Sequence, residues 1–276
     1  MTAVAAPRVL ADVGRRHRAH LRADRAIILG GIAAVGIGLL LFWQFGMGYV
    51  VNQRYISTPV DVAASLLDRI GSGDLPRHIA ATMTAAGGGY LIGIAVGLIG
   101  AFALLMTRRG YEVLEPFLLA FYAIPKIALA PLFIMWFGLA LTPKLLLAAL
   151  MVFFIVFMNT VSGVRNVDRG LVDVARVLGA TRMQLVRKIM LPAAAPSIMA
   201  AIRVTFARAM VGAILAEFIA SQAGLGYMIV RAARQFDIAT VFAGVVVIAM
   251  LVMVVNAAIG LLEARLFPWA TRTVAT

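Results

Sequence analysis

The stretch Asp173–Pro192 reads DVARVLGATRMQLVRKIMLP and forms a polar, arginine-rich island in a chain that is otherwise strongly apolar. The chain has 276 residues, of which 63% are hydrophobic, and its mean hydropathy is +0.98. Soluble domains are about 45–50% apolar, so this composition predicts a membrane protein with several spans. In such a protein, short amphipathic helices in the island are well placed to be held by a soluble partner.

Six apolar segments surround the island, and they predict an all-α integral membrane protein with six transmembrane helices. Four of them run for 20 residues or more without a formal charge, which is about the length needed to cross the hydrocarbon core. The other two contain charges: Lys126 in one, and Arg203, Arg208 and Glu217 in the other. The expected spans are residues 26–50, 79–106, 116–138, 145–163, 193–221 and 239–262.

The distribution of positive charge predicts the orientation of these spans. Residues 26–270 are expected to form one transmembrane domain between a basic N-terminal tail, 1–25, and a C-terminal tail, 271–276. The N-terminal tail, the 107–114 turn, residues 164–192 and the C-terminal stretch from Arg265 onward hold 16 of the 25 Lys and Arg, whereas the segments expected on the opposite side hold six. The positive-inside rule therefore predicts that both termini and the island are cytoplasmic. The first apolar run is too long for a cleaved signal peptide.

Composition also excludes several classes of function. The net charge of +13 is explained by arginines in loops that set topology, so it does not indicate nucleic-acid binding. The chain has no cysteine, which excludes disulfides, thiolate catalysis and cysteine metal sites. Its three histidines, His17, His20 and His78, lie outside the predicted spans and form no H-E-x-x-H motif. An intramembrane enzyme is therefore a poor interpretation.

Within the island, the pattern predicts two short helices in the coupling segment 166–192. Asp168 can cap a helix that begins near Arg169, and Gly179 can end it in a left-handed turn. Its apolar face recurs at i, i+3 and i+7 and consists of Leu171, Val174 and Leu178. A second helix, from about Arg182 to Met190, is expected to stop before Pro192. Periodicity alone fits equally well with a helix that lies on the lipid surface.

This island resembles the EAA loop of ABC importer permeases, in which E-A-A-x-x-x-G is followed by L-P. The matching residues are Asp173, Val174, Ala175 and Gly179, then Leu191-Pro192, with Asp and Val in place of Glu and Ala at the first two positions. The resemblance extends from about Ile56 to Trp269. Three further stretches resemble the nitrate/sulfonate/taurine type of permease: FYAIPKIALAPLFIMWFG (121–138), NTVSGVRNVDRGLVDVARVLGATR (159–182) and AEFIASQAGLGYMI (216–229).

The resemblance implies a type I ABC importer permease in the inner membrane of a bacterium. Two permease subunits, usually identical, form the pathway, and each docks a coupling helix into one of two cytoplasmic ATPase subunits. An extracytoplasmic binding protein delivers the solute, which the subfamily implies to be a small anion of the sulfonate, nitrate or taurine kind. ATP and Mg²⁺ belong to the ATPase, because this chain has no G-x-x-x-x-G-K-[ST] loop and is expected to bind no cofactor. The implied coupling residues are Arg169, Leu171, Asp173, Val174, Ala175, Arg176, Leu178, Gly179 and Ala180.

Charges inside the spans are candidates for the translocation pathway, because a charge at depth normally faces protein or a water-filled cavity. The charged candidates are Lys126, Arg208 and Glu217. The neutral Tyr122 and Met135 could gate or line the same pathway, with a place in the apolar core as their alternative. Arg208 and Glu217 are nine residues apart, about 13 Å along a helix, so each needs a partner elsewhere. The alternative for each charge is an ion pair between helices or snorkelling to an interface. Pro125 and Pro131 are expected to kink the third span or to free carbonyls in it.

Three shorter sequence patterns predict a surface helix, a helix contact and a turn. Thr58-Pro59 predicts the start of a short interfacial helix that runs to about Ile70. Gly89, Gly93 and Gly97 form a close-approach stripe, which serves either packing within one subunit or the seam between two. Gly224–Tyr227 is read as a turn in an external loop that positions the outer mouth.

A secondary transporter driven by an ion gradient is the main alternative function, with Glu217 as a proton carrier. Such proteins commonly carry inverted repeats, and no convincing repeat relates the two halves of this chain. A scaffold without transport activity has no positive signal.

Overall fold

The computed structural model describes residues 27–50, 52, 55–107, 109–219 and 221–266. The predicted tails, 1–25 and 271–276, lie outside these residues, so their assignment stays a prediction. The chain divides into two compact units, residues 1–64 and 65–276, and each is described by itself.

In the first unit, the predicted first span is a helix over Ile27–Val50. It contains a π-helical segment, η1 (Phe42–Gly46), followed by α2 (Met47–Val50). The α3 helix (Pro59–Gly71) begins where the sequence predicts. Thr58 Oγ1 accepts from the Asp61 amide at 3.2 Å, and Asp61 Oδ2 accepts from the Thr58 amide at 3.3 Å, so the two ends of the first turn cap each other.

The second unit is built around three long helices: α4 (Asp74–Leu105), α7 (Leu141–Arg165) and α10 (Leu191–Ile219). Their shared core contains small and aromatic side chains from all three, among them Ala85, Tyr90, Ala148, Val152, Phe206 and Ala209. The α12 helix (Ile238–Leu266) packs against α10. Among the described residues, five helices are long and apolar enough to span a membrane, and a broken pair makes a sixth, in agreement with the expected all-α membrane fold.

That broken pair is the predicted third span. The α5 helix (Gly110–Ala123) is followed by the short η3 (Lys126–Leu129) and α6 (Ala130–Phe137), with a bend of 80° between the two halves. Pro125 causes the break, because it holds the preceding Ile124 in an extended conformation, ψ 129°. The expected kink at Pro125 is confirmed. Pro131 does not kink the span, because it lies in the first turn of α6, where proline is tolerated.

The coupling segment contains α8 (Arg169–Val177) and α9 (Arg182–Leu185). The expected stop before Pro192 is wrong, because α9, the π-helical η4 (Val186–Met190) and α10 form one continuous helix over Arg182–Ile219. The Leu191 amide donates to the Val186 carbonyl, five residues back, and this wider turn accommodates a proline that lacks an amide donor.

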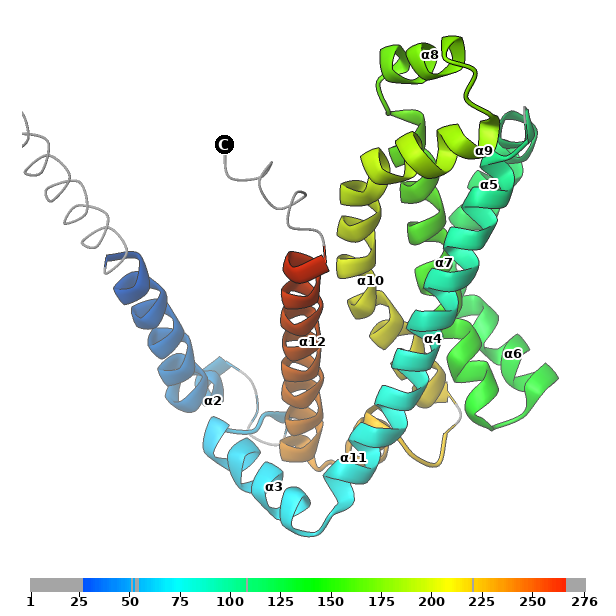
Figure 1. Cartoon of the computed structure of the whole chain (residues 1–276). Coiled ribbons are helices and arrows are strands. Elements are labelled where there is room, and N and C mark those ends of the chain that lie inside the picture. The colour runs from blue at the N-terminus through cyan, green and yellow to red at the C-terminus, as the bar shows by residue number, and fades with distance from the viewer. Residues whose placement is uncertain (1–26, 51, 53–54, 108, 220, 267–276) are drawn as a thin grey trace, which may run out of the picture. The chain divides into compact units, whose positions relative to one another are not determined.

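Figure 1 places α8 at one end of the second unit and α11 (Leu225–Arg234) at the other; these ends are called the α8 end and the α11 end. The sequence interpretation missed α11, because it read Gly224–Tyr227 as a turn in a loop. Only Gly224 precedes the helix, and Leu225 begins it. The overlooked signal is an apolar face at i, i+3, i+4 and i+7, formed by Leu225, Met228, Ile229 and Ala232, all of them buried.

The glycine stripe packs α4 against α7 within the subunit. A Cβ at Gly89 would lie 2.4 Å from the Ala148 Cβ, and a Cβ at Gly93 would lie 2.6 Å from the Ala149 carbonyl oxygen. The two backbones therefore approach too closely for any side chain at these positions. This resolves the open alternative in favour of packing within one subunit.

We expect Gly89→Ala to lower the stability of the purified chain by about 1–3 kcal/mol, because the added methyl group overpacks the α4–α7 contact. The measurement is the thermal unfolding midpoint in detergent. Gly87→Ala is the matched control, since a Cβ at Gly87 meets nothing within 4 Å. Equal midpoints for the two variants would contradict the close contact.

Candidate functional site

The α8 helix has the predicted boundaries, and local interactions explain both ends. Asp168 Oδ1 accepts from the Gly170 amide at 2.8 Å, which caps the first turn. Gly179 has φ +80°, and the Ala180 amide donates to the Ala175 carbonyl at 3.0 Å. A left-handed glycine that closes the helix in this way is a common C-terminal cap. The predicted cap by Asp168 at the start of α8 and the predicted left-handed turn at Gly179 are both confirmed.

The α8 helix presents an apolar surface that no described residue covers. Leu171, Val174, Val177 and Leu178 are 56%, 63%, 88% and 81% exposed. Val172 is buried and holds the helix to the rest of the unit, where α8 contacts α9 and η4. On the same helix, Arg176 and Asp173 form an exposed ion pair at 3.2 Å. A large exposed apolar patch on a projecting helix is typical of a contact surface for a partner.

The second helix of the coupling segment ties α8 to the bundle. Thr181 and Gln184 form a capping box at the start of α9. The Arg182 Nη2 donates to the Leu105 carbonyl at 3.1 Å and to the Thr107 carbonyl. These two carbonyls lie at and just beyond the C-terminal end of α4, so Arg182 links the segment to a core helix.

A cavity of about 520 Å³ lies beside this link, and it is lined by Leu105, Arg176, Ala180, Arg182, Leu185, Val186 and Met190. Its lining includes Arg176 of α8 and Leu105 at the end of α4. The role of Arg182 escaped the sequence interpretation, which counted it only as one of the positive charges of a loop.

Two of the predicted pathway residues meet at the break between α5 and α6. The Lys126 ammonium donates to the Tyr122 carbonyl at 2.7 Å and lies 4.5 Å from the centre of the Tyr122 ring. It also lies 5.0 Å from the centre of the Phe154 ring on α7. No carboxylate of the described residues forms an ion pair with Lys126. Met135, on α6, is 73% exposed.

The structure separates the other two predicted residues, Arg208 and Glu217, onto different faces of α10. Arg208 is exposed, and no described side chain pairs with it. Glu217 is 1% exposed and accepts hydrogen bonds from Thr82 Oγ1 at 2.9 Å and from the Gly226 amide at 2.8 Å. The sequence predicts that Arg208 and Glu217 each need a partner outside their own helix. Glu217 has such partners on α4 and α11, whereas Arg208 has none among the described side chains.

Glu217 belongs to a buried network, the Glu217 clasp, which consists of Glu217, Thr82, His78 and the amides of residues 224–226. Thr82 Oγ1 donates to Glu217 and accepts from the Leu225 amide at 2.7 Å. His78 Nδ1 accepts from the Gly224 amide at 3.0 Å. The clasp therefore holds the start of α11 against α4 and α10.

The geometry of Gly224 explains why the clasp accepts only glycine there. Its φ is +125°, and a Cβ would lie 2.2 Å from the Glu217 carboxyl carbon. Beside it, the Lys144 ammonium donates to Ser221 Oγ at 2.6 Å and to the Ala223 carbonyl at 3.2 Å. The loop that leads into α11 is thus fixed by side chains from α4, α7 and α10.

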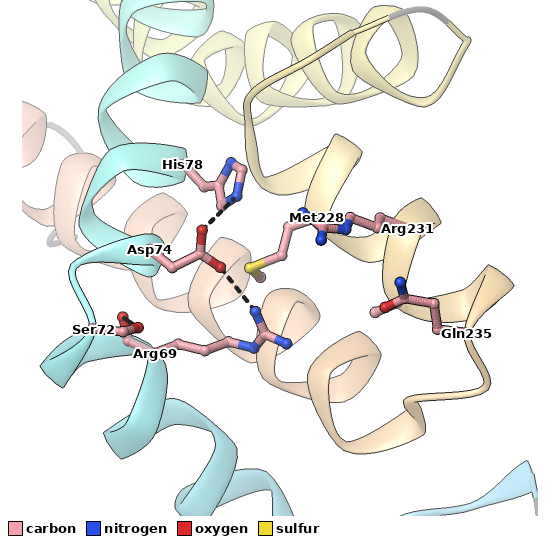
Figure 2. A pocket seen from close by; sticks show the side chains of 8 residues that line it. Arg69, Ser72, Asp74, His78, Met228, Arg231 and Gln235 are labelled. Atoms are coloured by element: carbon pink, nitrogen blue, oxygen red, sulfur yellow. Dashed lines mark hydrogen bonds and ion pairs between the residues drawn. The ribbon is translucent and has the colours of Figure 1, made fainter.

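A charged cluster continues from the clasp to the surface at the α11 end, as Figure 2 shows. Asp74 accepts from Arg69 Nη1 at 2.8 Å, and His78 Nε2 lies 3.3 Å from its other oxygen. A neutral His78 with its proton on Nε2 satisfies both contacts, because Nδ1 already accepts from Gly224. These three side chains line a cavity of about 340 Å³, together with Arg231 of α11 and Gln235 just after it.

Asp237 extends this cluster between α11 and α12. Burial acts to raise the pKa of Asp237, but hydrogen bonds from the side chain and amide of Thr240, together with the Arg69 guanidinium, outweigh it. The pKa of Asp237 is therefore held below its ordinary value, and the carboxylate stays charged at neutral pH. Arg69 in this way joins α3, the start of α4 and the start of α12.

Comparison with known proteins identifies a family and several relatives. Residues 89–268 match the family described as "Binding-protein-dependent transport system inner membrane component". The chain is 36% identical over 233 residues to the putative aliphatic sulfonates transport permease protein SsuC of Bacillus subtilis (strain 168), covering 84% of each chain. It is 37% identical over 232 residues to the riboflavin transport system permease protein RibX of Chloroflexus aurantiacus, covering 84% of this chain and 87% of the relative. It is 31% identical over 247 residues to the taurine transport system permease protein TauC of Escherichia coli (strain K12), covering 86% and 88%.

Solved structures show the same fold. A chain of the MetNI methionine ABC transporter in inward-facing conformations superimposes with a TM-score of 0.59 at 21% identity, covering 69% of this chain and 95% of that one. A chain of an amino acid ABC transporter superimposes with a TM-score of 0.55 at 19% identity, covering 73% and 98%. The arrangement of helices is thus that of an ABC importer permease.

Proposed function

We propose a transport mechanism that starts from one fact: this chain belongs to the family of binding-protein-dependent transport system inner membrane components. It is a multi-pass permease subunit of an ABC importer in the inner membrane. It carries no ATPase domain, so ATP is bound and hydrolysed by a partner subunit. A system of this kind also has a solute-binding protein.

We propose that α8 and the turn after it dock into the ATPase partner. The observation that carries this proposal is the uncovered apolar surface of a helix that projects from the α8 end. The docking residues would be Arg169, Leu171, Asp173, Val174, Ala175, Arg176, Leu178, Gly179 and Ala180. Movement of this helix is transmitted to α4 through the hydrogen bonds of Arg182.

The proposed assembly contains two copies of this chain, two ATPase subunits and one binding protein. The α8 end and both termini lie in the cytoplasm, as the distribution of Lys and Arg predicts. The binding protein approaches the α11 end. In this proposal the second permease subunit covers part of the apolar faces that α5, α6 and α10 expose among the described residues.

The translocation pathway is proposed to follow Tyr122, Lys126, Met135 and Arg208. Each is partly or largely exposed in the single subunit, although each comes from an apolar span. Glu217, the fifth sequence candidate, is enclosed by Thr82 and Gly226. We propose for Glu217 the structural alternative, in which it holds the loop before α11.

The solute is proposed to be a small anion with a sulfonate or similar group. Two relatives are named for aliphatic sulfonates and for taurine, and Lys126 and Arg208 supply positive charge along the proposed pathway. A third relative is named for riboflavin, which is a large neutral molecule and provides a contrasting probe.

Uptake by the complete complex tests this proposal. The chain, its co-purified ATPase and its binding protein are reconstituted in proteoliposomes and supplied with ATP and taurine, ethanesulfonate or riboflavin. We expect ATP-dependent accumulation of a sulfonate that riboflavin does not inhibit. Accumulation of riboflavin alone would contradict the anionic substrate, whereas a lack of ATP-dependent uptake with any probe and of stimulated ATP hydrolysis would contradict the importer assignment.

A further inference from the structure

Two positive charges of this chain lie inside the membrane without a negative partner among the described residues. Lys126 contacts a carbonyl and two aromatic rings, and Arg208 forms no interaction with a described side chain. By contrast, Arg203 lies 3.9 Å from Glu263, and Lys144 donates to Ser221 and Ala223. A cation at depth costs several kcal/mol unless it faces water, protein or a counter-charge.

The position of Phe154 gives the depth of Lys126. Phe154 lies thirteen residues after Leu141 and eleven before Arg165, the two ends of α7. At 1.5 Å per residue, it is about 17–20 Å from either end of this helix. The Lys126 ammonium is 5.0 Å from the Phe154 ring, so the charge lies near the middle of the membrane-spanning helix.

The contact between α7 and α10 gives the depth of Arg208. A Cβ at Gly212 would lie 2.8 Å from the Ala148 Cα, so these two residues are level with each other. The helices run in opposite directions, and one turn from Gly212 to Arg208 corresponds to one turn from Ala148 to Val152. Val152 is two residues, or about 3 Å, from Phe154. Lys126 and Arg208 therefore lie at nearly the same depth.

The exposed face of α10 that carries Arg208 also carries Leu215, which lies at the contact between α10 and α6. This face is a narrow stripe at i, i+4, i+7, i+11 and i+14, formed by Val204, Arg208, Val211, Leu215 and Phe218. Its member Leu215 packs against the cluster in which Ala130 of α6 meets Ala216 of α10. Lys126 lies one short turn before Ala130, and Arg208 lies two turns before Leu215 on its own stripe, so the two cations belong to segments that lead into the same contact between α6 and α10.

We propose that Lys126 and Arg208 together form an anion-binding site at the middle of the translocation pathway, which takes the sulfonate or comparable monoanionic group of the solute. This inference rests on the proposed function. Two long cationic side chains at one depth provide a diffuse positive potential rather than a binding site with fixed coordination geometry. Such a site admits anions and repels cations without holding the solute tightly.

The absence of cysteine allows the electrostatic potential at this site to be measured without knowledge of the natural solute. Val211→Cys, on the stripe beside Arg208, and Ile127→Cys, beside Lys126, place single reporter thiols at exposed positions. Each is treated with the anionic reagent 2-sulfonatoethyl methanethiosulfonate or its cationic trimethylammonioethyl analogue. The thiolate attacks the thiosulfonate sulfur, a mixed disulfide forms and methanesulfinate leaves. The rate is read from the mass of this chain in the reconstituted complex.

We expect neutralisation of either cation, by Lys126→Gln or Arg208→Gln, to lower the ratio of anionic to cationic reaction rates at both reporters by roughly tenfold. Arg203→Gln is the matched control, because it removes a positive charge from the same helix, five residues away, and should leave both ratios unchanged. A response of each reporter only to its own neighbour would overturn the shared site. Unchanged ratios, or no reaction with either reagent in any nucleotide state, would overturn it as well.

Uptake and stimulated ATP hydrolysis are measured on the same samples, so that failure of the anion site can be distinguished from failure of the importer assignment. Unchanged rate ratios with ATP-driven uptake intact remove the anion site and leave the importer assignment standing. Loss of ATP-driven transport from the parent single-cysteine complexes and from the cysteine-free chain removes the proposed function, and with it the site.

Discussion

Gly179→Arg should abolish the stimulation of ATP hydrolysis by the loaded binding protein, with a loss of at least about tenfold, while the chain still inserts into the membrane. Gly179 has φ +80°, and a side chain in this conformation costs about 1–2 kcal/mol. A charged side chain would also stand beside the exposed Leu178, on the surface proposed to enter the ATPase. The few residues that dominate an interface each contribute about 2 kcal/mol or more, which is about a thirtyfold change in affinity.

Gly73→Arg provides a matched control for this prediction. Gly73 has nearly the same conformation, φ +76°, and a Cβ there also meets nothing within 4 Å. It precedes α4 at the α11 end, away from the proposed ATPase contact. We expect the ATPase subunit to co-purify with Gly73→Arg and to be lost from Gly179→Arg. Equal retention by the two variants would show that α8 is not the docking element.

Glu217→Leu should destabilise the chain by about 2–6 kcal/mol and release α11. The substitution leaves the Gly226 amide and the Thr82 hydroxyl without their buried acceptor, and each lost acceptor costs about 1–3 kcal/mol. The thermal unfolding midpoint reports the loss of stability, and hydrogen exchange of residues 221–234 reports the release of α11. Glu217→Gln, which keeps one acceptor oxygen, should recover part of both.

The control for this prediction is Glu263→Leu. Glu263 is also a glutamate on a membrane helix, but the Arg203 guanidinium that pairs with it is 3.9 Å away and largely exposed. We expect its effect on the midpoint to be much smaller than that of Glu217→Leu. If Glu217→Leu left both the midpoint and the exchange of α11 unchanged while it abolished uptake, the pathway role of Glu217 would replace the structural one.

The features that sequence reasoning predicted correctly depend on short-range signals. The long apolar runs require helices because a membrane offers no other partner for backbone amides. The ends of α8 follow from Asp168 and Gly179, which act on their own turn of helix. The break at Pro125 likewise follows from the restriction that proline places on the preceding residue.

Two of the features that it missed, the Glu217 clasp and the Arg182 link, depend on contacts between distant residues. Glu217 and Thr82 are 135 positions apart, and Arg182 and Leu105 are 77 apart, so neither pair is visible as a motif. The charge of Glu217 at membrane depth was the available signal, but it does not identify its partner. The continuous helix through Pro192 depends on a π-helical turn, for which the sequence carries no recognised pattern.

The most direct test of the central claim compares two energy sources in one vesicle preparation. The complete complex receives ATP and Mg²⁺ on the ATPase side together with the loaded binding protein, and the chain alone receives only a proton or sodium gradient. We predict accumulation of solute in the first case, its loss with Gly179→Arg, and no accumulation in the second. Accumulation by the chain alone, driven by the ion gradient, would contradict the claim that ATP hydrolysis in a partner drives transport through α8.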